Sequence, residues 1–325
     1  MTNNNTTDLK SIESDVPDNV AFLCCASYEE RCKSIALALD KSKVNSAFVF
    51  YDSKYVLTSV ASEISGCFSN AEIKQMNLSN PIEVADVFAK TVENIQNREI
   101  ENIIIDITTF THESLLILLK ILHSFKNVFK KIGCLYTGAG SYGGVSTPPE
   151  QKWLSKGCKD VRNVLGYPGI LRPAAKTCLI ILAGFELERA ARLIELLEPD
   201  RIAIGNGLDP TNDAISDTMA YFRNKFNEWE KEYKNRICES FDFSCKNIIS
   251  TVESINSLIN SNPNDNYILI PLNTKLSTIA SALAALQNPK IQVCYSIPEI
   301  YNIENYSTSS DKITFFELSD MIPFK

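Results

Sequence analysis

The sequence lacks the residues and segments that mark several common protein classes. It has only two histidines, His112 and His123, and its 10 cysteines form no Cys-x-x-Cys pair, so the ligand spacing of a metal site is absent. No apolar run is long enough to cross a membrane, and the N-terminus has neither the basic start nor the apolar core of a signal peptide. We therefore expect no metal, reduced thiols and a cytoplasmic protein.

The common nucleotide-binding signatures are also missing. The segment Cys24-Cys25-Ala26-Ser27, after the first expected strand, has none of the glycines of a dinucleotide fingerprint, and no Walker lysine motif is present. We therefore exclude a standard NAD site or ATP-hydrolysing site and expect no cofactor. The net charge of −7 argues against broad binding of duplex nucleic acid. A small anionic ligand needs only a few local donors and stays compatible with this charge.

Apolar strands alternate with amphipathic helices twice along the chain. The expected strands lie at 20–25, 47–51, 71–76, 103–107 and 132–136, and again at 178–182, 201–204, 237–243, 267–270 and 291–295. This alternation predicts an α/β fold of two tandem Rossmann-like domains, each a doubly wound parallel sheet. A late strand is also expected at 313–318.

The same pattern defines the expected domain boundaries. We predict a disordered lead-in at 1–19, a first domain at 20–145, a Gly/Pro-rich connector at 146–176 and a second domain at 177–325.

The two halves carry matching sequence features in the same order, which indicates an internal duplication. The matches are residues 26–31 with 184–189, residues 106–109 with 271–274, and the tyrosine pair Tyr136 and Tyr142 with Tyr295 and Tyr301. The second match places Thr109 on Thr274, so that the first half has Phe110 where the second half has Lys275. Duplication predicts two similar domains that face each other like the subunits of a homodimer.

All repeated motifs follow predicted strands, at the sheet edge where open α/β folds bind ligands. Helix N-termini at that edge favour phosphate or carboxylate groups. The candidate ligand-binding residues are Ser27, Arg31, Asp106, Thr108, Thr109, Glu186, Arg189, Asn273, Thr274 and Lys275. The alternative stays open that these side chains only cap helices or form pairs within a helix.

Candidates for proton transfer are fewer. Glu30 and Glu188 lie directly after the first strand of each half, and His112 is the one histidine at a predicted strand end. The sequence does not decide whether any reaction is catalysed.

A polar loop after the first strand and an Asn273-Thr274-Lys275 loop after the fourth resemble the CRISPR-associated Rossmann-fold superfamily, including its fused two-lobed relatives (CARF and SAVED-like domains). The resemblance covers residues 20–145 and 177–305. It implies dimeric or pseudo-dimeric pockets that bind cyclic nucleotides and sometimes cleave them, together with an effector, here a separate protein.

Three functional hypotheses follow. In the first, a nucleotide-like ligand is held between two pseudo-symmetric lobes of a sensor or accessory protein, plausible in bacterial antiviral defence, that acts on a separate effector. In the second, the protein is a hydrolase or nuclease that uses the acids after the first strands. In the third, it is a scaffold subunit of a multiprotein complex.

Overall fold

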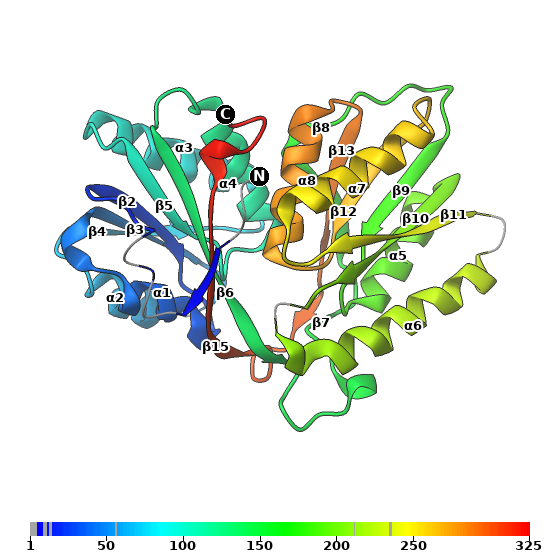
Figure 1. The fold of residues 1–325 in the computed structure, drawn as a ribbon, viewed down its shortest axis with the longest axis horizontal. Coiled ribbons are helices and arrows are strands. Elements are labelled where there is room, and N and C mark those ends of the chain that lie inside the picture. Colours follow the sequence, from blue (N-terminus) through cyan, green and yellow to red (C-terminus); the bar gives the residue numbers. More distant parts are fainter. Residues whose placement is uncertain (1–4, 9–11, 13–14, 56, 211, 234–235) are drawn as a thin grey trace. The chain divides into compact units, whose positions relative to one another are not determined.

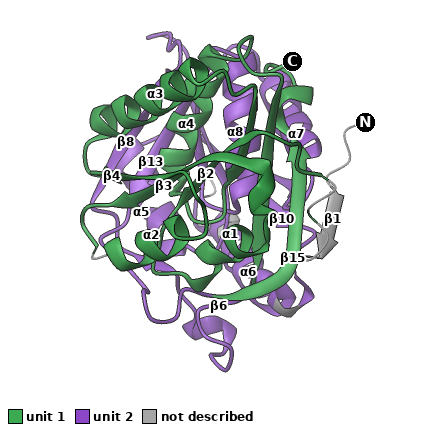
Figure 2. Ribbon diagram, turned by 90° about the vertical axis from the view of Figure 1, so that its left-hand side faces the viewer, with its two compact units in different colours: residues 1–139, 308–325 green, residues 140–307 purple. Residues whose placement is uncertain are grey.

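The computed structural model describes residues 5–8, 12, 15–55, 57–210, 212–233 and 236–325. The chain forms two compact units (Figures 1 and 2). Unit 1 contains residues 1–139 and 308–325, and unit 2 contains residues 140–307.

Unit 1 is built on a seven-stranded sheet. In sheet order its strands are β1 (Asn5–Asp8), β15 (Ser307–Glu317), β6 (Lys131–Tyr142), β5 (Asn102–Asp106), β2 (Val20–Cys25), β3 (Val44–Asp52) and β4 (Ala71–Met76). The central pairs β6–β5, β5–β2, β2–β3 and β3–β4 are all parallel. Strand β2 is buried over its whole length, as expected for a parallel strand that is covered on both faces.

Helices cover both faces of this sheet. They are η2 (Glu30–Lys33), α1 (Ser34–Ala38), η3 (Lys41–Lys43), α2 (Thr58–Ser65), α3 (Pro81–Asn97), α4 (His112–Ser124) and η6 (Leu318–Asp320). Val49 of β3 belongs to the apolar cluster that α1 and α2 form on one face. Phe50, the next residue, points to the other face, where its ring lies 5.0 Å from that of Phe88 in α3.

Unit 2 repeats this arrangement with a six-stranded sheet. In sheet order its strands are β11 (Ile237–Ser244), β10 (Arg201–Leu208), β9 (Thr177–Leu182), β12 (Asn266–Pro271), β13 (Ile291–Ile297) and β8 (Asp160–Pro168). Only the β13–β8 pair is antiparallel. A separate pair is formed by β7 (Ser155–Lys156) and β14 (Ile300–Tyr301).

The helices of unit 2 follow the same plan. They are η4 (Pro149–Gln151), α5 (Leu187–Leu197), η5 (Asp213–Ile215), α6 (Ser216–Glu232), α7 (Ile248–Ser261) and α8 (Lys275–Gln287). Ile181 of β9 packs in one cluster with Leu193 of α5 and Phe226 of α6. Ile180, which points to the opposite face of β9, is equally buried, so this sheet is also covered on both sides.

The predicted fold class is confirmed: the protein is α/β with two tandem Rossmann-like units. The parallel strands run β4-β3-β2-β5-β6 in unit 1 and β11-β10-β9-β12-β13 in unit 2. Each unit therefore places its strands in the same spatial order, which is the order expected of a duplicated doubly wound domain.

The edge strands divide the chain differently from the predicted ranges. β8, the second strand after β6, pairs with β13 in unit 2. β15, the second strand after β13, lies beside β6 in unit 1. As a result the range 146–176, predicted as a connector, contributes β7 and β8 to unit 2, and residues 308–325 complete unit 1.

The predicted disordered lead-in at 1–19 also needs correction. Asn5–Asp8 pairs with β15 as an antiparallel edge strand. Ile12 and Val16 are buried in the same cluster as α1 and α2. The described part of this segment is therefore ordered because it adds to a sheet edge and to an apolar core.

The second sequence match is shifted by two residues. Thr111 and Thr274, not Thr109 and Thr274, are the equivalent N-cap residues, because each hydroxyl accepts a hydrogen bond from a serine N–H three residues later. α4 therefore begins with His112 where α8 begins with Lys275. The first half has a histidine at the lysine position, and Phe110 lies outside the comparison.

Candidate ligand-binding site

A pocket lies at the carboxyl ends of three neighbouring strands of unit 2. It is lined by residues that follow β9 and β12, by the end of β10, and by one face of α6: Ala183, Gly184, Phe185, Asn206, Gly207, Met219, Phe222, Arg223, Phe226 and Asn273. The chain continues from β9 to β10 on one side of β9, and β12 lies on its other side. The pocket therefore lies at the topological switch point, where doubly wound sheets bind ligands.

Glycines allow the backbone segments around the pocket to approach each other closely. A Cβ at position 184 would lie 1.9 Å from the carbonyl oxygen of Leu272. A Cβ at position 207 would lie 2.6 Å from Sγ of Cys245 and 3.0 Å from Nδ2 of Asn273. The 1.9 Å contact is with a backbone atom, so position 184 requires glycine. A side chain at position 207 would displace Cys245.

Asn273 joins the loops on either side of the switch point. Its Nδ2 donates to the carbonyl oxygen of Ala183, at the end of β9. Its Oδ1 accepts from the backbone N–H of Thr274 at 2.8 Å and from Sγ of Cys245 at 3.3 Å. The side chain is fixed at both ends, so it positions the pocket wall, and little hydrogen-bonding capacity is left for a ligand.

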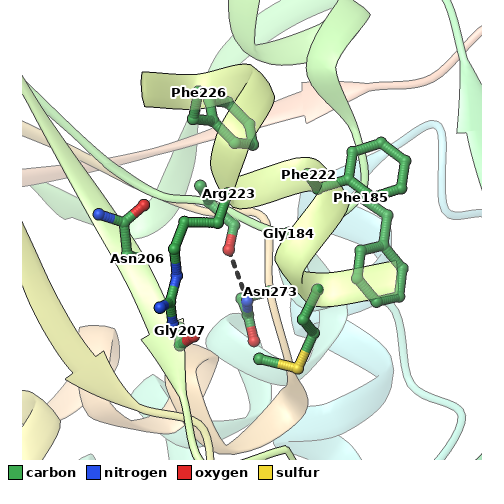
Figure 3. A pocket seen from close by; sticks show the side chains of 10 residues that line it. Gly184, Phe185, Asn206, Gly207, Phe222, Arg223, Phe226 and Asn273 are labelled. Carbon is green, nitrogen blue, oxygen red and sulfur yellow. Dashed lines mark hydrogen bonds between the residues drawn. The ribbon is translucent and has the colours of Figure 1, made fainter. Parts of the chain in front are cut away.

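Arg223 brings a positive charge into the pocket. Its Nη2 donates to the carbonyl oxygen of Gly207 at 3.2 Å, and the side chain extends from α6 toward Gly207, between Asn206 and Asn273 (Figure 3). In the part of the chain that the structure describes, no carboxylate pairs with it. A half-buried guanidinium with donors to spare suits a phosphate or carboxylate group.

Aromatic rings form another wall of the pocket. The ring of Phe185 lies 5.1 Å from that of Phe222 on α6, and 5.6 Å from that of Tyr142 at the end of β6. The pocket has about 280 Å³ of empty space, including its open side. The enclosed part is much smaller, about 20 Å³, which is room for about one water-sized group, so a ligand would place one group here and its remainder at the open side.

Of the residues that the sequence suggested in unit 2, only Asn273 lines the pocket. Thr274 is the N-cap of α8, and Lys275 is the half-buried first residue of that helix. Glu186 and Arg189 are buried and form an ion pair, and Arg189 also donates to the carbonyl oxygen of Ser296. These two side chains are therefore held by internal partners.

Glu188 is exposed and accepts a 3.4 Å hydrogen bond from the backbone N–H of Gly157. Its counterpart as a candidate acid, Glu30, is also exposed and lies 3.6 Å from the ammonium of Lys33. Neither belongs to the residues that line the pocket.

In unit 1 the suggested residues mostly bond to one another or to the backbone. Arg31 is buried, forms a 2.8 Å ion pair with Glu29 and donates to the carbonyl oxygen of Thr137 at 3.0 Å. The hydroxyl of Thr109 donates to the carbonyl oxygen of Cys25 at 2.5 Å. Asn273 makes a comparable contact in unit 2, to the carbonyl oxygen of Ala183, which lies one residue further along than the equivalent of Cys25.

The remaining candidates of unit 1 lie at helix starts. The Ser27 hydroxyl accepts from the backbone N–H of Glu29 at 3.3 Å, which is a local turn contact. His112, the first residue of α4, is half-buried.

Asp106, at the end of β5, is a buried carboxyl group in an unusual setting. Its Oδ1 accepts from the backbone N–H of Thr108 at 3.0 Å, and its Oδ2 has no hydrogen-bond partner. The backbone N–H of Thr137 donates to Oγ1 of Thr108 at 3.0 Å, and the hydroxyl of Thr137 also has no hydrogen-bond partner. Burial raises the pKa of Asp106 to about 7, against the lowering effects of Thr108 and Arg31.

Sequence reasoning missed most of the pocket. The strand expected at 201–204 stops short of Asn206, which is a buried residue of β10. Arg223 is not among the ligand-binding residues that the sequence predicts. A signal for it exists, because Met219, Phe222, Arg223 and Phe226 share one helical face by their spacing. An arginine on an otherwise apolar face marks a position worth examining.

Two further findings concern the whole chain. Among the described residues, no helix has the length and apolar character needed to span a membrane. The nine described cysteines are free thiols.

No protein-family model matches the chain, and no curated protein matches its sequence. Among solved structures, the chain is similar to one described as the periplasmic ribose ABC transporter from Conexibacter woesei DSM 14684, with 8% sequence identity and a TM-score of 0.22. The match covers 86% of this chain and 72% of that chain. A likeness this weak carries no argument about the ligand, and the description of the fold rests on the strand orders given above.

Proposed function

We propose that the protein binds a small anionic, nucleotide-like ligand in the pocket of unit 2, with the anionic group on Arg223. One observation carries the proposal: a half-buried arginine faces a pocket at the switch point, and no carboxylate of the described chain neutralises it. A charge in such a place is costly unless a partner compensates it, and a bound phosphate or carboxylate would do so.

The surroundings of Arg223 support a ligand with both polar and apolar parts. Asn206 is an amide on the same wall, and Phe185 and Phe222 offer ring surface. This mixture suits a phosphate attached to a sugar or a base. The wider hypothesis, a cytoplasmic sensor that signals to a separate partner protein in antiviral defence, rests on the resemblance to the CRISPR-associated Rossmann-fold superfamily and is part of this proposal. The proposal also includes the hypothesis that the ligand contacts unit 1.

Binding has better support than catalysis. The candidates for proton transfer, Glu30, Glu188 and His112, do not line the pocket. Glu186, another acid after a first strand, is tied to Arg189. A scaffold role predicts a stable partner whose capture is unchanged by pocket variants, whereas the binding proposal predicts that Arg223 matters.

The test is ligand-induced thermal stabilisation of the purified protein, with inorganic phosphate, adenosine monophosphate and cyclic dinucleotides as probes. Wild type should melt at a higher temperature with at least one probe, and Arg223→Gln should lose at least nine-tenths of the affinity. Arg192→Gln is the matched control, because Arg192 is an exposed arginine on the neighbouring helix α5 and pairs with the exposed Glu195. If no probe shifts the wild-type transition, the proposal fails.

A further inference from the structure

The counterpart of the pocket in unit 1 can be located from the strand registers. Cys25–Phe50 is the last pair between β2 and β3, and Leu182–Gly205 is the last pair between β9 and β10. The residues that follow Phe50 in unit 1 therefore correspond to those that follow Gly205 in unit 2. On this basis Tyr51 corresponds to Asn206, and Asp52 to Gly207.

In unit 1, these two residues occupy the place that corresponds to the pocket of unit 2 and add a carboxyl group to it. Tyr51 is buried where unit 2 has the smaller Asn206, and its hydroxyl lies 3.0 Å from Oε1 of Gln75 on β4, to which it donates. Asp52 places a buried carboxyl group where unit 2 has no side chain, and its Oδ1 accepts from the backbone N–H of Lys54 at 3.1 Å. A carboxylate at this position repels an anion.

The helix that supplies the cation in unit 2 has no equivalent charge in unit 1. α2 follows β3 as α6 follows β10, but it has only eight residues, and its single charged side chain is Glu63. Glu63 pairs with Lys33 at 2.8 Å. Lys54, which precedes α2, is an exposed cation whose Nζ lies 5.2 Å from the ring of Tyr55. Among the described residues of unit 1, Arg31 is a buried cation at this edge, but it is already paired with Glu29, and α2 brings no counterpart of Arg223.

We infer that each chain binds one anionic ligand group, at Arg223 in unit 2, and that the corresponding place in unit 1 is closed to anions. This inference rests on the proposed function and adds the location and the stoichiometry of the site. The duplicated fold has one anion site and one filled counterpart, so its two units are not interchangeable in binding.

The experiment is isothermal titration calorimetry of the full chain with whichever probe gives the largest thermal shift among inorganic phosphate, adenosine monophosphate and cyclic dinucleotides. We expect one ligand per chain in wild type, at least a tenfold loss of affinity in Arg223→Gln, and an unchanged isotherm in Lys54→Gln. Arg223→Lys, which keeps the charge but loses the planar fork, should retain one site with intermediate affinity. Circular dichroism melting shows whether each variant is folded.

The outcomes separate the two levels of the proposal. Two equal sites per chain, or one site that survives in Arg223→Gln and disappears in Lys54→Gln, would overturn the inference while ligand binding itself stands. One ligand shared by two chains would also overturn it. If no probe binds at all, the proposed function fails, and the inference fails with it.

Discussion

Arg31 and Arg189 make the same contact in their own units. Arg31 donates to the carbonyl oxygen of Thr137 at 3.0 Å, and Arg189 donates to that of Ser296. Both carbonyl groups belong to the fifth parallel strand of their unit. Each arginine also forms an ion pair with a buried glutamate that precedes it. The repeated Glu and Arg of the sequence therefore connect the start of the first helix in each unit to the fifth parallel strand, one strand beyond the switch point.

Arg31→Met should destabilise the protein strongly. The change leaves the buried carboxylate of Glu29 without its 2.8 Å partner and the carbonyl oxygen of Thr137 without a donor. Loss of one member of a buried ion pair costs about 3–5 kcal/mol. Urea denaturation followed by circular dichroism measures the change in the free energy of unfolding.

The double variant Glu29→Leu/Arg31→Met should recover part of this loss, because no unpaired charge is left in the interior. Arg192→Met serves as the control, since Arg192 and Glu195 form an exposed pair whose removal costs at most about 1 kcal/mol. Equal destabilisation by Arg31→Met and Arg192→Met would contradict a structural role for the buried pair.

The free energy of unfolding should depend on the ionisation of Asp106. Its pKa in the folded state is raised to about 7 from 3.8, so the folded state binds the proton more tightly than the unfolded state does. This group therefore destabilises the fold progressively as pH rises from about 4 to about 7, by about 4 kcal/mol at most, at about 1.4 kcal/mol per pKa unit. The penalty is absent below pH 4 and complete above pH 7.

Asp106→Asn should consequently be more stable than wild type at pH 8 and close to wild type at pH 4. Urea denaturation at a series of pH values gives the difference between the two proteins. This difference isolates Asp106 from the other groups that titrate in the same range. A difference that stays constant from pH 4 to pH 8 would show that Asp106 titrates normally.

Most parallel strands could be predicted from the sequence because they are apolar segments of strand length, whereas β4 and β11 mix apolar and polar residues. The late strand expected at 313–318 overlaps β15, but the places of the edge strands in the two sheets could not be predicted. β8 and β15 are mostly exposed or half-buried, and each pairs with a strand of the other half of the sequence. β6 also continues through Gly138 and Gly140 to Tyr142, beyond the strand expected at 132–136. Pairing over such distances depends on tertiary structure and leaves no local signal.

The candidate site divides in the same way. Asn273 could be predicted because it directly follows a strand, where polar residues of doubly wound sheets converge. Arg223 lies inside a long helix, and only the packing of α6 against β10 brings it to the strand ends. Arg31 and Arg189 occupy matching positions in the two halves of the sequence. Such repetition can reflect a shared structural contact as well as binding, and here both side chains are buried in internal ion pairs.

Asp209→Asn should strengthen anion binding. Asp209 is exposed and follows β10. Burial raises the pKa of the Cys245 thiol to about 12; the charge of Asp209 raises this pKa further, and the charge of Arg223 lowers it. Both charges therefore act on the same region of unit 2. Removal of an exposed charge changes an interaction by about 0.2–1 kcal/mol, or roughly one-and-a-half-fold to fivefold in affinity.

The titration should be repeated at high ionic strength, where the advantage of Asp209→Asn should shrink because salt screens exposed charges. Asp217→Asn is a control of equal charge, at an exposed position in the first turn of α6. An equal gain in both variants would point to net charge, and weaker binding in Asp209→Asn would contradict an anionic ligand at Arg223.

Gly184→Ala should both destabilise unit 2 and weaken binding. The new Cβ would lie 1.9 Å from the carbonyl oxygen of Leu272, a backbone atom that cannot rotate away, so the two loops that carry Phe185 and Asn273 must separate. Overpacking of this kind costs about 1–3 kcal/mol.

Gly66→Ala is the matched control: its Cβ would lie 3.3 Å from the nearest atom, the carbonyl oxygen of Ser62, and alanine suits its right-handed backbone. Urea denaturation and calorimetry of both variants should show a loss of stability and affinity at position 184 alone, and a Gly184→Ala protein that binds like wild type would show that the pocket does not need these loops in contact.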